Sequence, residues 1–102
     1  MAMGSTQPFR PVGTASLTAG ATSSAVALAG GGESVVVTNT AATLAFVRFG
    51  ADPSVAATTA DMPVLPGTRV MLAANSLITY AAVLLTSGTG LVLFTRGDGS
   101  FV

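Results

Sequence analysis

The chain has 102 residues, and only eight of them are charged: four arginines and four acidic residues, which give a formal net charge of zero. An average domain of this length carries about 25 charged residues. Lysine, histidine, cysteine and tryptophan are all missing from the sequence. This composition excludes disulfides, thiolate metal sites and cysteine nucleophiles, and it removes the usual general bases. No enzyme activity, metal or cofactor is therefore expected.

The few charges also limit the partners of this protein. The arginines are scattered and balanced by the acidic residues, so no basic surface for nucleic acid is expected. The longest uncharged stretch, residues 70–95, is interrupted by polar and glycine-rich segments, which predict a hairpin and not a membrane span. Residues 1–8 lack the basic and apolar regions of a secretion signal, so export by that route is not expected. A surface so poor in charge is expected to face other protein.

The first segment in chain order is predicted to be extended. Pro8 and Pro11 flank Phe9 and Arg10, and prolines so placed disfavour a helix. The expected organisation is an N-terminal arm over residues 1–13, followed by one domain over residues 14–102. Two interpretations of the arm stay open: Phe9 and Arg10 anchor it to a neighbouring molecule, or Phe9 caps the protein's own sandwich.

The rest of the chain is predicted to form short strands. Runs of β-branched and apolar residues alternate with Gly, Pro, Asn and Ser, which is typical of strands joined by turns. The expected strands cover residues 25–29, 33–40, 43–49, 62–65, 68–73, 77–85 and 91–96. Pro66-Gly67 is predicted to form the centre of a type II turn. Seven or eight strands at this spacing predict an all-β fold, an antiparallel sandwich or a jelly roll.

The strand at residues 43–49 is apolar on both faces and contains one charge, Arg48. An unpaired buried charge is costly, so Arg48 is expected to pair with Asp52, with Asp61 or with an acid on an adjoining subunit. An outer face rich in apolar side chains also suggests contact with another element or subunit.

Three other patterns have functional interpretations that we consider weaker than their structural ones. Asp52 and Asp61 could form an acid–base or metal pair, but aspartates in such loops more often cap turns. The tripeptide 96–98, Arg-Gly-Asp, occurs in integrin ligands, yet here it is expected to end the last strand. The glycines at 30–32 lack the Lys and Ser/Thr of a phosphate loop, so a turn is expected there.

The order of segments resembles small β-rich structural proteins of tailed-bacteriophage virions. The resemblance covers nearly the whole chain and rests on PFRPVG, ATSSAVAL, VVVTNTAATLAFVRFG, ATTADMPVLPGTRVML and LVLFTRGDG. It implies a virion component assembled in the host cytoplasm, such as a capsid decoration or cement protein, with a sandwich or jelly-roll fold, a trimeric state and no catalytic residues. Its partners would be the major capsid protein or other virion proteins.

Two functions are compared on this basis. The first is a non-enzymatic capsid decoration protein that stabilises the phage head through apolar contacts. The alternative is a tail, neck or fibre-associated adhesion module. The candidate interface residues are Phe9 and Arg10 of the arm, Arg48 of the apolar strand, and three aromatic residues near loops, Phe49, Tyr80 and Phe101.

Overall fold

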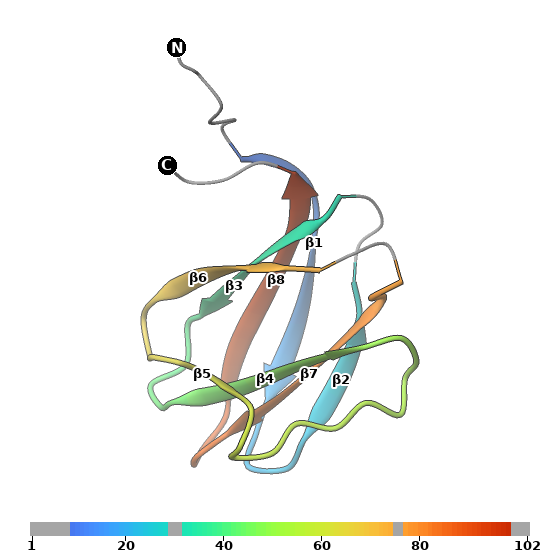
Figure 1. Cartoon of the computed structure of the whole chain (residues 1–102). Helices are drawn as coiled ribbons and strands as arrows, with labels where there is room; N and C mark the ends of the chain where they lie inside the picture. Colours follow the sequence, from blue (N-terminus) through green and yellow to red (C-terminus); the bar gives the residue numbers. More distant parts are fainter. Residues whose placement is uncertain (1–8, 29–31, 75–76, 99–102) are drawn as a thin grey trace.

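The computed structural model describes residues 9–28, 32–74 and 77–98, and eight strands make up most of them (Figure 1). The strands are β1 (Arg10–Ala19), β2 (Ser24–Ala27), β3 (Ser34–Asn39), β4 (Ala45–Gly50), β5 (Met62–Val64), β6 (Arg69–Ala73), β7 (Tyr80–Leu85) and β8 (Gly90–Asp98). They form two four-stranded antiparallel sheets packed as a sandwich, which confirms the all-β prediction. Within the described ranges there is no helix, and so none that could cross a membrane.

The strands pair in a nested order. β1 pairs with β8, β2 with β7, β3 with β6 and β4 with β5, so the first half of the chain folds back along the second. The pairs β8–β3 and β7–β4 then complete two sheets, with the orders β1-β8-β3-β6 and β2-β7-β4-β5. Segments from both ends of the chain therefore lie side by side in the first sheet (Figure 1).

Alternating side chains place the core between the sheets. Val35 and Val37 of β3 and Phe94 of β8 are fully buried from one sheet, and Val83 of β7 meets them from the other. The residues between them on each strand point to the opposite face, because side chains alternate along a strand. The β-branched residues that predicted β3 also suit a pleated, buried surface.

The predicted turn at Pro66-Gly67 is confirmed. Gly67 has a φ of +71°, a conformation that glycine adopts without steric cost. The Thr68 N–H donates to the Leu65 carbonyl at 3.3 Å, which closes the turn. The chain thereby passes from the edge of one sheet, at β5, to the edge of the other, at β6.

The first strand, β1, was not among the strands predicted from the sequence, and it begins within the predicted arm of residues 1–13. β1 starts at Arg10, and Pro11 lies opposite Gly97 of β8. Proline is accepted in an edge strand, and a bulge at Val12 shifts the register, so that Gly13 lies opposite Arg96. A Cβ on Gly97 would lie 2.1 Å from the Arg10 carbonyl oxygen, so glycine allows this close pairing. The rest of the predicted arm, residues 1–8, lies outside the described residues.

Candidate functional site

A long loop, residues 51–61, crosses the outer face of the β2-β7-β4-β5 sheet. It leaves β4 at Gly50 and returns to β5 on the other side of β4. Midway, the Ala57 N–H donates to the Ser23 hydroxyl beside β2 at 2.8 Å. Ala82 of β7 points to this outer face and still has no exposed surface. The loop therefore covers much of this face.

The two aspartates of the loop cap its turns, as their structural interpretation predicted. Asp52 accepts the Ser54 N–H at 2.9 Å and also a hydrogen bond from the Ser54 hydroxyl. These two bonds, that of the hydroxyl first, hold the pKa of Asp52 below its usual value. Asp61 accepts the Thr58 N–H at 2.6 Å. Both carboxylates thus stabilise the loop's own backbone.

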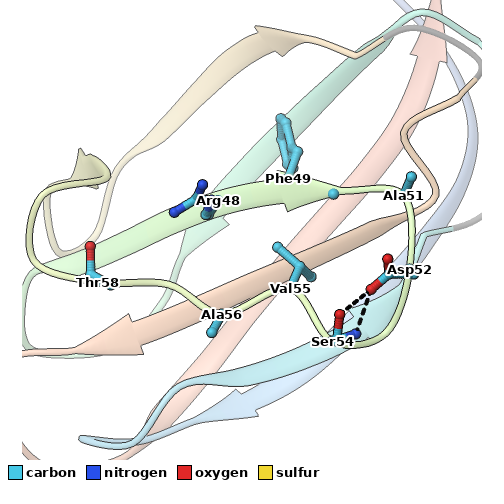
Figure 2. Close-up of a pocket in the computed structure, with 9 residues that line it drawn as sticks. Arg48, Phe49, Ala51, Asp52, Ser54, Val55, Ala56 and Thr58 are labelled. Carbon is cyan, nitrogen blue, oxygen red and sulfur yellow. Dashed lines mark hydrogen bonds between the residues drawn. The ribbon is translucent and has the colours of Figure 1, made fainter.

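Arg48 lies on the outer face of β4 and pairs with Asp61, which confirms one of its predicted partners. The Arg48 Nη1 atom is 3.8 Å from the Asp61 Oδ1 atom, and the Arg48 side chain is 56% exposed. Because the arginine of this pair is solvated, the pair contributes little to stability. Arg48 and the loop line an open hollow of about 550 Å³, and Figure 2 shows Asp52, Ser54 and Val55 on its rim.

This hollow holds few groups able to do chemistry. Its lining combines one arginine already paired with Asp61, one aspartate already bonded to Ser54, and otherwise small or apolar residues. Among the described residues, no three potential metal ligands of the His, Cys, Asp or Glu type gather anywhere. The arrangement suits a structural role for the loop, which holds the covered face of this sheet in place.

The outer face of the β1-β8-β3-β6 sheet is largely open, apart from Val36, which is only 5% exposed beside Phe9. It carries rows of hydroxyl and aliphatic side chains, in which Ser16, Leu93 and Thr38 form one row that ends at Arg69. The members of the face are Thr14, Ser16, Thr18, Leu91, Leu93, Thr95, Ser34, Val36, Thr38, Arg69, Met71 and Ala73. Arg69 is the one charge among them.

The two candidates of the predicted arm lie at this open sheet. Phe9 is half-buried and, with Val36 and Thr95, lines a shallow hollow of about 200 Å³. Phe9 thus lies beside the protein's own sheet, and both interpretations of the arm remain predictions. Arg10 is exposed at the first position of β1, opposite Asp98.

The structure does not bring the remaining candidates to one place. Phe49 packs against the buried core from β4, in agreement with the core packing that was weighed for it. Tyr80 is half-buried at the start of β7, opposite Gly50. Phe101 lies outside the described residues. The candidate residues are therefore spread over both sheets.

Two buried polar side chains fix opposite ends of the sandwich, a role that the sequence indicated for neither of them. The Asn39 amide donates to the carbonyls of Thr43 and Val64, each at 3.0 Å, and its oxygen accepts the Ala41 N–H at 2.9 Å. An asparagine that ends a run of valines and threonines is the one signal that could have indicated it.

Arg96, 3% exposed, fixes the other end. Its guanidinium donates to the carbonyls of Gly32, at 3.1 Å, of Ala74, at 3.3 Å, and of Ile78. The tripeptide 96–98 therefore lies within β8, with its arginine inside the protein. Because Arg96 is buried, it is not available for an integrin-type contact. The tripeptide lies at the end of the last strand, as its structural interpretation predicted.

Comparison of the chain with protein-family models, with curated proteins and with solved structures found no match.

Proposed function

We propose that this protein is a non-enzymatic structural component of a tailed-phage virion, a decoration or cement protein that binds the capsid as a homo-oligomer. The sequence resemblance is the basis for the virion, and the resemblance implies a trimer. The tail, neck or fibre-associated module remains the alternative within the same proposal.

The observation that carries the proposal is that the outer face of the β1-β8-β3-β6 sheet carries a single charge, Arg69. Seven of the eight charged residues are at least partly exposed, since only Arg96 is buried, yet only Arg69 lies on this face. Its serine, threonine, valine and leucine side chains lose little conformational entropy when a partner covers them. A face with one charge also limits the cost of desolvating ions in a close contact.

The connectivity of the strands supports the proposal at the level of the fold. Nested pairing of eight strands in two sheets is the connectivity of a jelly roll, which viral capsid domains and lectin domains share. A fold hosts many functions, so this support is by analogy alone. It agrees with the capsid role and equally with the adhesion alternative.

Attachment through this face would draw on the burial of apolar surface. Removal of 1,000 Å² of apolar area from water contributes up to about 25 kcal/mol before the cost of association. The polar hydroxyls of the threonines would pair with backbone or side chains of the capsid protein. Repetition over many sites would stabilise the shell against internal pressure.

The test compares virions that contain or lack this protein. Decorated particles should survive heat and osmotic shock that disrupt particles without it, and equal survival would contradict the cement role. Quantified protein bands from virions should show hundreds of copies per particle. Six or twelve copies would instead support a neck or tail position.

A matched pair of variants tests which face attaches. Leu91 is 42% exposed on the open sheet, and Leu77 is 74% exposed before β7. Leu91→Lys should reduce the protein bound to virions at least tenfold, because it places a charge in the contact. Leu77→Lys should leave binding unchanged. Equal binding of both variants would exclude the open sheet as the attachment face.

A further inference from the structure

The sandwich has four edge strands, and β1 differs from the other three. β1 has ten residues, whereas β6, β2 and β5 have five, four and three. Among the described residues, β1 forms backbone hydrogen bonds with β8 alone, so its other edge presents unpaired N–H and C=O groups. Such an edge is a template for another strand.

The usual protections of an edge strand are confined to one end of β1. Natural edges are protected by charges, prolines, bulges or short length. In β1 the charge at Arg10, the proline at position 11 and the bulge at Val12 all come first. From Gly13 to Ala19 the strand has neither charge nor proline and keeps an unbroken register with β8.

The other edges are shorter, and each has a protection of its own. β5 contains Pro63 within its three residues. β2 is flanked by the loop that Ala57 anchors to Ser23. β6 is short and begins with a charge, Arg69. The unprotected part of β1 is therefore the one long edge, among the described strands, that is open to strand addition.

We infer that this edge binds the same edge of a second copy of the chain, antiparallel, with Ser16 on the twofold axis. A strand that pairs antiparallel with its own copy forms a closed, symmetric contact. With the axis at Ser16, Thr14 lies opposite Thr18 of the second copy, and Ala15 lies opposite Leu17. The two β1-β8-β3-β6 sheets then become one eight-stranded sheet.

The side chains of β1 suit this register. An axis normal to the sheet keeps outer residues opposite outer residues, so Ser16 meets Ser16 and threonine meets threonine on the exposed face. Threonine and serine pairs across strands are stabilising, whereas like charges at those positions would repel. Since residues 13–19 carry no charge, no repulsion opposes the contact.

This inference does not depend on the virion role. Pairing of β1 with β1 uses that edge in both copies and closes a dimer, whereas the resemblance implies a trimer. The mass of the protein in solution distinguishes the β1 dimer from the trimer. A trimer would overturn the β1 contact and leave the proposed function standing, and a β1 dimer would stand even if the protein were absent from virions.

A single cysteine tests the register directly, because the chain has none of its own. Opposite residues of an antiparallel pair have Cα atoms about 4.5–5.5 Å apart, within the range that a disulfide spans. Ser16→Cys should give mostly disulfide-linked dimer on mild oxidation. The control, Ala73→Cys, lies exposed on the same face at the opposite edge, in β6, and should stay mostly monomeric. Equal cross-linking of both variants, or of neither, would overturn the inference.

Light scattering provides the second measurement. The apparent mass of the full chain should double between dilute and millimolar protein. Ser16→Lys should keep the monomer mass while its circular dichroism and thermal unfolding stay unchanged, because two lysines would meet at the axis. Ala73→Lys should still dimerise. A full chain that remains monomeric at millimolar concentration would exclude the contact whether or not the lysine variant folds.

Discussion

The outer faces of the two sheets of this sandwich differ in how far the chain itself covers them. The β2-β7-β4-β5 sheet has short edges, and the 51–61 loop covers Ala82 on its outer face. The β1-β8-β3-β6 sheet has a ten-residue edge and an outer face with one charge, Arg69. The chain's own loop covers the outer face of the β2-β7-β4-β5 sheet, whereas most side chains on the outer face of the β1-β8-β3-β6 sheet are exposed or half-buried. We therefore expect a partner to bind the β1-β8-β3-β6 sheet.

The largest effect is expected where one side chain ties together connections of both sheets. Arg96→Met would leave the carbonyls of Gly32, Ala74 and Ile78 without their donor inside the protein. Each buried group left unpaired costs about 1–3 kcal/mol, so the free energy of unfolding should fall by about 4 kcal/mol. Urea unfolding measures this loss of free energy. Arg69→Met, at an exposed position, should cost less than about 1 kcal/mol, and equal losses would contradict the role given to Arg96.

The opposite end of the sandwich should be somewhat less sensitive. Asn39→Ala removes two donated hydrogen bonds and one accepted bond, to Thr43, Val64 and Ala41. We expect the free energy of unfolding to fall by about 2–3 kcal/mol, because these groups stay buried. Thr40→Ala next to it, on an exposed residue, should lower the melting temperature far less. A stable Asn39→Ala protein would show that solvent reaches this end.

A smaller effect is expected when the 51–61 loop is displaced from the outer face of the β2-β7-β4-β5 sheet, because this face would then be less covered. A Cβ on Gly50 would lie 2.7 Å from the Val55 Cβ, so Gly50→Ala must push the loop outward. Overpacking of this kind costs about 1–2 kcal/mol. Limited proteolysis should then cleave within residues 51–61 sooner. Gly20→Ala, where a Cβ would make only ordinary contacts, is the control, and the same cleavage rate in both variants would oppose this account.

The smallest effect concerns pH and the Asp52 cap. Ser54 holds the pKa of Asp52 below its usual value, so this cap favours the folded loop above that value. The contribution should disappear as the pH falls through the lowered pKa. A carbon NMR titration of Asp52 should show a midpoint below 3.8. Ser54→Ala should bring the midpoint back toward 3.8, and an unchanged midpoint would rule out Ser54 as the cause.

Local patterns in the sequence were enough to predict most strands. The valines and threonines of β3 and the alternating residues of β4 have the composition of strands wherever they occur. Pro66-Gly67 predicts its turn because proline fixes its own φ and glycine accepts the positive φ at the next position. The Arg48–Asp61 pair could also be predicted, because the chain contains only four acidic residues.

Features that depend on distant partners could not be predicted in this way. β1 is rich in Thr, Ala, Ser and Gly, a weak strand signal, and its conformation comes from pairing with β8 at the far end of the chain. Arg96 receives its three carbonyl partners from connections 18 to 64 residues away in sequence. The separation of a covered from an open sheet follows from where the 51–61 loop folds, which no local pattern specifies.

Hydrogen–deuterium exchange at two protein concentrations tests most directly the claim that the chain associates with itself through the open sheet, at its β1 edge. On concentration, amides of β1 between Gly13 and Ala19 should exchange more slowly, because a second copy supplies their missing partners, and amides of residues 51–61 should exchange at the same rate. Protection of the 51–61 loop with no change in β1 would contradict the account.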